Sequence, residues 1–196
     1  MPKLSIVVPC YNEEEAIPLF YPAVEKVVKQ MPVETEYWFV NDGSSDDTLA
    51  ELRKLHAQDP ERVHYVSFSR NFGKEAGLYA GLQAATGDYV VVMDADLQDP
   101  PEYLPEMYKA ISTGEYDCVG MRRTDRKGEA KFKSFLSNQF YNVINKISDT
   151  KIVSGARDYR MMTRQMVNAV LSLTEYNRFS KGIFNWVGFK TKYLPY

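Results

Sequence analysis

The 196-residue chain has few cysteines, little net charge and no long hydrophobic run. Its two cysteines, Cys10 and Cys118, lie far apart in apolar surroundings, which excludes a CxxC zinc or redox motif and indicates a reducing compartment. The longest strongly apolar run, residues 89–93, is far shorter than the roughly 20 residues that span a bilayer. The first residues also lack the apolar stretch of a signal peptide. We therefore expect a soluble chain.

A surplus of basic residues is lacking as well. The formal net charge is −2, whereas nucleic-acid-binding proteins are as a rule strongly basic, so we expect no nucleic-acid partner. Glycine and proline lie near average usage, which excludes collagen-like and low-complexity proteins. The 44% of hydrophobic residues can bury a sizeable core, and no repeat or linker interrupts the chain. The sequence predicts a single domain over residues 1–196.

Short β-branched runs alternate with helix-periodic segments in the first half of the chain. We expect strands over residues 4–9, 36–40, 63–68 and 89–93, and helices over residues 14–31, 46–56 and 74–85. This alternation predicts an α/β fold with a mostly parallel sheet flanked by helices. The later pattern is less regular and indicates helices over residues 101–111 and 129–147 and strands over residues 117–121 and 189–194. In such sheets ligands bind beyond the carboxyl ends of the strands, where we expect the site.

A polar segment, residues 41–46, follows the second expected strand. At that place the carboxylate of Asp42 can accept hydrogen bonds from the ribose or base of a nucleoside. The same residue types are typical of a well-made turn that leads into a helix. Taken alone, the segment is better interpreted as such a turn.

A second acidic segment ends the most hydrophobic strand. If the chain is extended there, Asp94, Asp96 and Gln98 project to one side. Two carboxylates and an amide oxygen are hard ligands that suit Mg²⁺ or Mn²⁺. Because two like charges leaving a buried strand need a cation or a donor nearby, we favour a metal site over a polar loop. We interpret Asp99 as the cap of the helix that the next two prolines open.

Basic residues gather between Arg122 and Lys133, where six of them stand against two acidic residues, a local net charge of +4. The helix expected over residues 129–147 has an apolar face. Basic groups beside such a helix suit an anionic lipid surface or an amphiphilic phosphate. A solvated loop followed by a core helix explains the pattern equally well.

Two further patterns bear on the site. Arg157 and Arg160 flank Asp158, which is typical either of a structural ion pair or of a phosphate-binding site. A glycine repeat runs into the helix expected over residues 74–85, and no Walker phosphate-binding pattern surrounds it. Such a repeat favours close packing of the helix on the sheet. Its members are Gly73, Gly77 and Gly81.

Together these motifs resemble the glycosyltransferases of family 2, which have the Rossmann-like GT-A fold. The resemblance rests on residues 6–14, 41–48 and 94–101. Residues 69–74 and the form of segment 94–101 are similar to the polyprenyl-phosphate glycosyltransferases, which include dolichol-phosphate mannosyltransferases and bactoprenol glucosyltransferases. Each motif is modest by itself, but four of them in order at these spacings are highly specific.

The resemblance implies an inverting transfer of a sugar, with glucose from UDP-glucose favoured, to undecaprenyl phosphate in the biogenesis of the cell envelope. It implies that a divalent metal stabilises the departing diphosphate as a Lewis acid. An acceptor phosphate is already ionised at neutral pH, so the resemblance implies an orienting or electrostatic role for Asp158. The residues carried over by position are Pro9, Tyr11, Glu13, Asp42 and Asp94 for the donor nucleotide, Asp94, Asp96 and Gln98 for Mg²⁺ or Mn²⁺, Arg122, Arg123 and Lys131 for the acceptor phosphate, and Asp158 and Arg160 for the reacting centre.

The resemblance also implies a membrane location. Members of the bacterial glucosyltransferase branch continue through an amphipathic segment into two transmembrane helices, and this sequence stops at Tyr196 before any such segment. We therefore expect a truncated form of a protein that works at the cytoplasmic face of the cell membrane. A homo-oligomer is compatible with the sequence.

Other functions stay open at this stage. A family 2 enzyme for a surface polysaccharide or teichoic-acid acceptor would usually carry a Glu-Asp pair as its base, and none follows Gly120. A metal-dependent phosphohydrolase normally has its DxD motif after the first strand, where residues 9–11 lie instead. A non-catalytic nucleotide-binding module would share the polar segments. The nucleotide base and the sugar cannot be read from the sequence.

Overall fold

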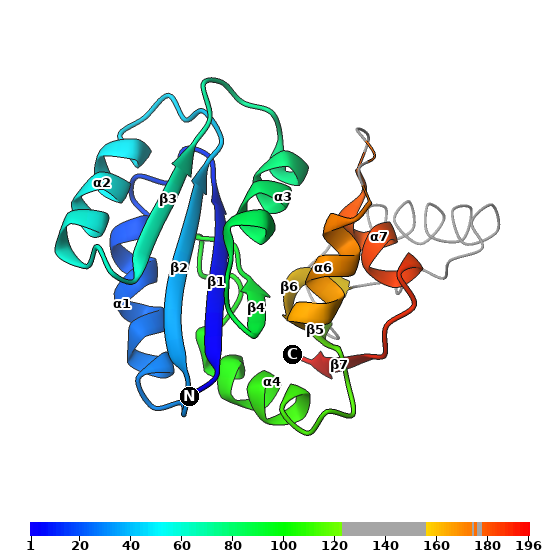
Figure 1. Ribbon diagram of the computed structural model, residues 1–196. Coiled ribbons are helices and arrows are strands. Elements are labelled where there is room, and N and C mark those ends of the chain that lie inside the picture. The colour runs from blue at the N-terminus through cyan, green and yellow to red at the C-terminus, as the bar shows by residue number, and fades with distance from the viewer. Residues whose placement is uncertain (123–155, 174, 176–177) are drawn as a thin grey trace, which may run out of the picture.

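The computed structural model describes residues 1–122, 156–173, 175 and 178–196, which form a seven-stranded sheet with helices on both faces (Figure 1). The strands lie in the order β3-β2-β1-β4-β6-β5-β7. Their bounds are β1 Lys3–Cys10, β2 Glu34–Asn41, β3 Val63–Ser67, β4 Tyr89–Val92, β5 Cys118–Arg122, β6 Ala156–Thr163 and β7 Thr191–Pro195.

The helices divide between the two faces of the sheet, as Figure 1 shows. One face is covered by α1 (Ile17–Val28), α2 (Thr48–Gln58) and α4 (Leu104–Ile111), which follows the short 3-10 turn Pro101–Tyr103. The other face is covered by α3 (Lys74–Ala84), α6 (Arg164–Leu171) and α7 (Ser180–Trp186). None of the described helices is both long and apolar enough to cross a bilayer.

The half of the sheet formed by β3, β2, β1 and β4 is parallel throughout, which confirms the fold predicted from the alternation of strands and helices. In β1, Leu4, Ile6, Val7 and Val8 are 0% exposed because helices cover both faces of the sheet. This covering explains why β1 reads as a continuous apolar run. The expected bounds of these strands differ from the observed ones by one or two residues.

The other half of the sheet contains a strand that the sequence pattern did not reveal. Strand β6 runs antiparallel between β4 and β5, and β7 pairs with β5 in parallel. The charged residues Arg157, Asp158 and Arg160 interrupt the apolar alternation of β6 and therefore concealed it. Helices α6 and α7 were not expected either. The expected helix over residues 129–147 lies outside the described residues.

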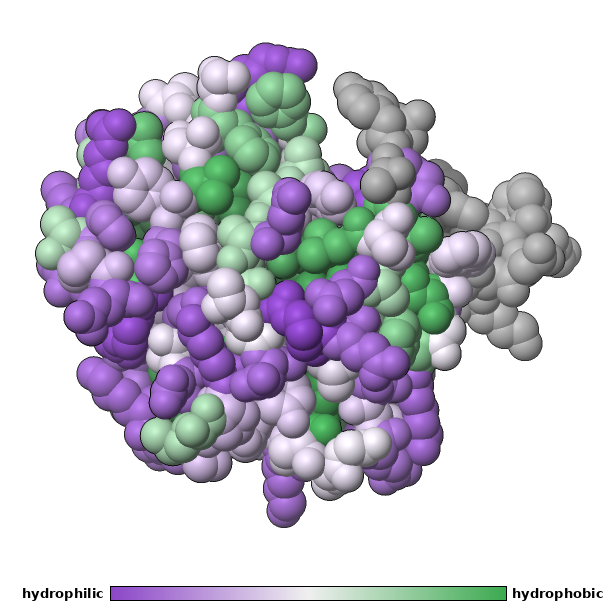
Figure 2. Space-filling view, viewed as in Figure 1, coloured by the Kyte–Doolittle hydropathy of each residue, from purple (hydrophilic) through white to green (hydrophobic). Residues whose placement is uncertain are grey.

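The close packing of α3 on the sheet that the glycine repeat predicted is found at Gly81, whereas Gly77 makes only ordinary contacts and Gly73 has no neighbour within 4 Å. A methyl group on Gly81 would lie 2.3 Å from Cγ1 of Val7, so only glycine allows this approach of α3 to β1. The opposite flank of α3 meets α6, and Figure 2 shows hydrophobic surface gathered there on an otherwise mainly hydrophilic face. The close packing fixes the first residue of α3, Lys74, near the carboxyl end of β1.

Candidate functional site

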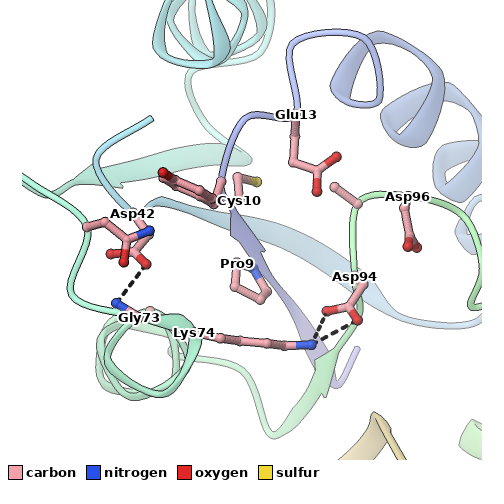
Figure 3. Close-up of a pocket in the computed structure, with 12 residues that line it drawn as sticks. Pro9, Cys10, Glu13, Asp42, Gly73, Lys74, Asp94 and Asp96 are labelled. Carbon is pink, nitrogen blue, oxygen red and sulfur yellow. Dashed lines mark hydrogen bonds and ion pairs between the residues drawn. The ribbon is translucent and has the colours of Figure 1, made fainter. Parts of the chain in front are cut away.

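A pocket of about 270 Å³ lies at the carboxyl ends of β1 and β4, beside the first turn of α3 (Figure 3). All five residues predicted to bind the donor nucleotide line it, together with Asp96 of the predicted metal site. The expectation that the site lies at the carboxyl edge of the sheet therefore agrees with the structure. The lining residues are Pro9, Cys10, Tyr11, Glu13, Asp42, Asn71, Gly73, Lys74, Gly77, Asp94, Ala95 and Asp96.

Asp42 fixes the loop that leads into α3. Its Oδ1 accepts a hydrogen bond from the backbone N–H of Phe72 at 2.7 Å, and its Oδ2 accepts one from Gly73 at 2.9 Å. The residue is only 4% exposed, and Gly73 has a φ of +95°, a conformation that favours glycine. The turn interpretation of residues 41–46 holds for the neighbouring Asn41, whose Oδ1 accepts from the Ser44 N–H. The bonds from Asp42 to the distant loop were not foreseen.

The acidic segment after β4 turns, so the extended geometry expected from the sequence is wrong. Strand β4 ends at Val92, and Leu97 has a left-handed φ of +58°. Asp94 is half-buried in the pocket wall, and Asp96 is exposed at its edge. Gln98 is exposed and is not among the lining residues, and its backbone N–H donates to Oδ1 of Asp96 at 3.0 Å.

Asp99 does not cap the following helix, which corrects the interpretation from the sequence. The capping position is Pro100, without a side-chain cap, and the two prolines after Asp99 offer no N–H to a capping carboxylate. Asp99 is instead 2% exposed, and its Oδ2 accepts from the Asp94 N–H at 3.5 Å, while its Oδ1 has no partner among the residues that the structure describes. Burial, with repulsion from Asp94, raises the pKa of Asp99 to about 6.

Negative charge is concentrated on the side of the pocket that carries Glu13, Asp94 and Asp96. Burial raises the pKa of Glu13, and the charges of Asp96 and Asp94 raise it further. Among the described residues, no three His, Cys, Asp or Glu side chains are arranged to hold a metal ion by themselves. The carboxylates of Asp94 and Asp96 nevertheless have the oxygen chemistry that Mg²⁺ and Mn²⁺ prefer. They fit an ion that completes its coordination with oxygens of a bound ligand.

Lys74 crosses the pocket from α3 to Asp94, passing Pro9, as Figure 3 shows. Its Nζ lies 2.7 Å from Oδ1 and 2.9 Å from Oδ2 of Asp94, and 3.0 Å from Oδ2 of Asp158. Burial acts to lower the pKa of Lys74, but Asp158 and Asp94 outweigh it, so the pKa is raised. No role was expected for Lys74 from the sequence. The sequence does contain one indication of a role: Lys74 is the first residue of a helix that is expected to start at the carboxyl edge of the sheet.

Asp158 reaches the site because β6 is antiparallel to β4. Val92 at the end of β4 pairs with Arg160 near the start of β6, so the start of β6 lies at the carboxyl edge of β4. The side chain of Asp158 meets Lys74 there. The structure thus brings Asp158 to the pocket's lysine, although Asp158 is not a lining residue.

Arg160, two residues further along the same face of β6, is buried and does not line the pocket. It is 2% exposed, and its guanidinium group lies 4.1 Å from the ring centroid of Phe184. Its Nη2 donates to the backbone oxygen of Arg157 at 2.8 Å, and its Nε meets no partner within the described part of the chain. The structure therefore does not bring Arg160 into the lining of the pocket.

The residues expected to bind an acceptor phosphate are described only in part. Arg122 is the last residue of β5 and is exposed. Arg123 and Lys131 lie outside the described residues.

Several known proteins are similar to this chain in sequence. The family "Glycosyl transferase family 2" matches residues 5–171. The putative glycosyltransferase CsbB of Bacillus subtilis (strain 168) is 45% identical over 193 residues, which are 98% of this chain and 58% of CsbB. The bactoprenol glucosyl transferase of Shigella phage SfX is 44% identical over 194 residues, which are 99% of this chain and 63% of that protein. The chain thus spans less than two thirds of the length of these relatives.

A solved structure shares the fold. The mannosyltransferase PcManGT from Pyrobaculum calidifontis, in complex with GDP-Man and Mn²⁺, matches with a TM-score of 0.70 at 21% identity. The match covers 99% of this chain and 55% of that chain. The helix-flanked, mostly parallel sheet is therefore a GT-A fold, as the sequence resemblance implied.

Proposed function

The chain belongs to glycosyl transferase family 2, and we propose that it transfers a sugar from a nucleotide diphosphate to a polyprenyl phosphate with inversion at the sugar carbon. UDP-glucose is the favoured donor and undecaprenyl phosphate the favoured acceptor. The relative from phage SfX, which is called a bactoprenol glucosyl transferase, supports this choice. Family membership favours glycosyl transfer over a phosphohydrolase. We further propose that residues 1–196 form one catalytic domain that meets its lipid acceptor at a membrane surface.

The convergence of Asp94, Asp96 and Lys74 on one pocket is the observation that carries the proposal. A donor diphosphate is strongly anionic, and carboxylates can share a site with it only when cations lie between them. A pocket that combines two carboxylates and one ammonium group at the carboxyl edge of an α/β sheet therefore suits a nucleotide diphosphate with a divalent ion.

The nucleoside end of the donor would lie against Pro9, Tyr11, Glu13 and Asp42. Each carboxylate oxygen of Asp42 accepts one backbone N–H and retains a further lone pair. Asp42 can thus accept a hydrogen bond from a ribose or a base while it stays bonded to the loop. Tyr11 is 49% exposed, and its ring would offer an apolar surface to the nucleoside.

Asp94 and Asp96 would hold Mg²⁺ or Mn²⁺, which offsets the negative charge that develops on the departing diphosphate. The complex of PcManGT with Mn²⁺ supports a divalent ion in this fold. Gln98 stays a proposed ligand, but its exposure and its place outside the pocket lining make the two carboxylates the principal ones.

The acceptor is a phosphate that is ionised at neutral pH, so the chain needs no strong base. Asp158 is proposed to orient the site through its ion pair with Lys74. Arg160 is proposed as a positioning residue because it is buried and its Nη2 bonds the backbone oxygen of Arg157. The residues proposed to bind the acceptor phosphate are Arg122, Arg123 and Lys131.

Titration calorimetry with a panel of UDP and GDP sugars, with and without Mn²⁺, tests the donor side. We expect UDP-glucose to bind only with Mn²⁺, and Asp96→Asn to weaken this binding by about tenfold or more, since it removes a charged ligand. Asp88→Asn is the matched control, because Asp88 is an exposed aspartate at the opposite end of β4. Binding that Asp96→Asn leaves unchanged would contradict the metal site, and preferred binding of GDP sugars would contradict the donor.

Transfer of labelled glucose tests the acceptor side. We expect label from UDP-glucose to enter undecaprenyl phosphate and an excess of a surface oligosaccharide to leave the rate unchanged. Label that enters the oligosaccharide instead would favour the alternative acceptor of the same family.

A further inference from the structure

Lys74 is the only cationic side chain among the described residues that line the pocket. An ammonium group has three N–H donors, and the structure gives it three acceptor oxygens within 3.0 Å, two from Asp94 and one from Asp158. Lys74 thus already occupies both oxygens of a carboxylate that is proposed to bind a metal. Each oxygen keeps a further lone pair, but a divalent ion on the same carboxylate would lie next to this ammonium group, so the two cations repel each other and compete for Asp94.

The backbone around Lys74 is held firmly, so a change of partner falls to the side chain alone. Asp42 bonds the N–H groups of Phe72 and Gly73 just before α3. Gly81 holds the same helix against β1, with no room for a methyl group. Rotation about four carbon–carbon bonds can move Nζ relative to this fixed backbone, and the side chain is 43% exposed, which leaves it space to move.

We propose that Lys74 is an exchangeable counter-cation of the donor site. In the empty site its ammonium group neutralises Asp94 and Asp158 and holds β4 and β6 together at the carboxyl edge of the sheet. When the divalent ion takes Asp94, Lys74 keeps its contact with Asp158 and turns its free donors to the diphosphate. This inference rests on the proposed function and adds an order of events to it.

The exchange makes binding of the metal and binding of the nucleotide cooperative. Without a nucleotide, the metal has to displace Lys74 from Asp94 and leaves the ammonium group with one anionic partner fewer. With a nucleotide present, the diphosphate supplies that partner. By linkage, the factor by which the nucleotide raises the metal affinity equals the factor by which the metal raises the nucleotide affinity.

The affinity for Mn²⁺, measured by calorimetry with and without UDP, tests the exchange. In the wild type we expect UDP to tighten Mn²⁺ binding by about tenfold or more. In Lys74→Met we expect Mn²⁺ alone to bind several-fold more tightly, because its competitor for Asp94 is gone, and Mn²⁺ with UDP to bind more weakly. Lys74→Arg keeps the positive charge and should retain most of the enhancement by UDP.

Lys54→Met is the matched control, because Lys54 also pairs with a carboxylate, that of Glu51, on the distant helix α2. It should leave both affinities unchanged. If Lys74→Met does not fold, Lys74→Gln, which keeps a hydrogen-bond donor without the charge, takes its place with the same expectation.

The decisive readout is the ratio of the affinity for Mn²⁺ with UDP to the affinity for Mn²⁺ without UDP. If Lys74→Met tightens Mn²⁺ binding by the same factor with and without UDP, Lys74 acts as a fixed charge and the exchange is overturned. If Lys74→Met leaves the affinity for Mn²⁺ unchanged both with and without UDP, the exchange is overturned as well. A wild-type chain that binds Mn²⁺ but no UDP would instead contradict the proposed function, so the two failures are distinguishable.

Discussion

Asp42 bonds the N–H groups of Phe72 and Gly73 with a side chain that is 4% exposed, and the same side chain lines the pocket. One carboxylate therefore shapes the entry to α3 and faces the ligand at the same time. Stability and binding are coupled at this residue, since a loop that loses its anchor also moves the pocket wall.

Asp42→Ala tests this coupling. It leaves two partly buried N–H groups without their acceptor, so we expect the free energy of unfolding to fall by about 2 kcal/mol and the affinity for UDP with Mn²⁺ to fall by about tenfold. The control is Asp88→Ala, since Asp88 also accepts a backbone N–H, that of Lys3, but at an exposed position where water can replace it. Urea unfolding and calorimetry measure both. Loss of affinity without loss of stability would contradict the anchoring role.

Motifs in the sequence predicted several of the residues that line the pocket, whose roles stay predictions, but they did not indicate residues that only tertiary contacts bring there. Asp42 and Asp94 fall in the pocket because both follow strands of one parallel sheet. The roles of Asp99 and Lys74 depend on partners that are remote in the chain or on a turn, such as the left-handed Leu97, that no local pattern announces. A helix cap can be predicted from neighbouring residues alone, which is why the sequence indicated this role for Asp99.

Helix α3 carries Lys74 at its first turn and lies on β1 through two glycines with different surroundings. A methyl group on Gly81 would lie 2.3 Å from Cγ1 of Val7, whereas one on Gly77 would lie 3.6 Å from Cβ of Pro9, an ordinary contact. Alanine substitutions at the two positions therefore distinguish two effects on stability. At both positions alanine favours the helix, but only at position 81 does its methyl group overlap with a neighbour.

We therefore expect Gly81→Ala to lower the free energy of unfolding by about 2 kcal/mol, because α3 has to move away from β1. Gly77→Ala should leave it unchanged or raise it by up to about 1 kcal/mol, because alanine favours the helix and meets no close neighbour. Urea unfolding of the two variants provides the comparison. Equal losses in both would show that the glycines serve α3 in some way other than close approach.

Among the helices and strands, those with a regular apolar pattern could be predicted, whereas those whose pattern is interrupted by charged residues could not. Strand β1 and helix α3 have continuous patterns and were expected within a few residues of their observed bounds. Strand β6 places Asp158 and Arg160 on one face, where the first meets Lys74 and the second lies on Phe184. These charged residues interrupt the apolar alternation by which a strand is recognised.

The whole sheet is continuous across the junction of β4 and β6, although the strand direction changes there. Val91 of β4 and Met161 of β6 are paired, 0% exposed and part of the same hydrophobic cluster. Such a shared core is typical of one cooperative unit. The two tryptophans stand on either side of the junction, Trp38 in β2 and Trp186 at the end of α7.

This arrangement predicts that the two halves unfold together. In Trp38→Phe the fluorescence reports on Trp186, and in Trp186→Phe it reports on Trp38. Far-UV circular dichroism gives the urea midpoint of global unfolding for each variant. In both variants we expect the fluorescence midpoint to coincide with this global midpoint. Midpoints that differ beyond error would contradict the single domain and would indicate that the β4–β6 junction separates first.

The position of β6 also has a consequence during protein synthesis. A ribosome releases the chain from its amino end, so β4 is finished well before residues 156–163 exist to cover its outer edge. During that interval Val90, Val91 and Val92, which are at most 1% exposed in the finished sheet, border an unpaired strand edge. The nascent chain is therefore most prone to aggregation in the interval between the synthesis of β4 and that of β6, and chaperone binding in this interval would raise the yield of folded protein.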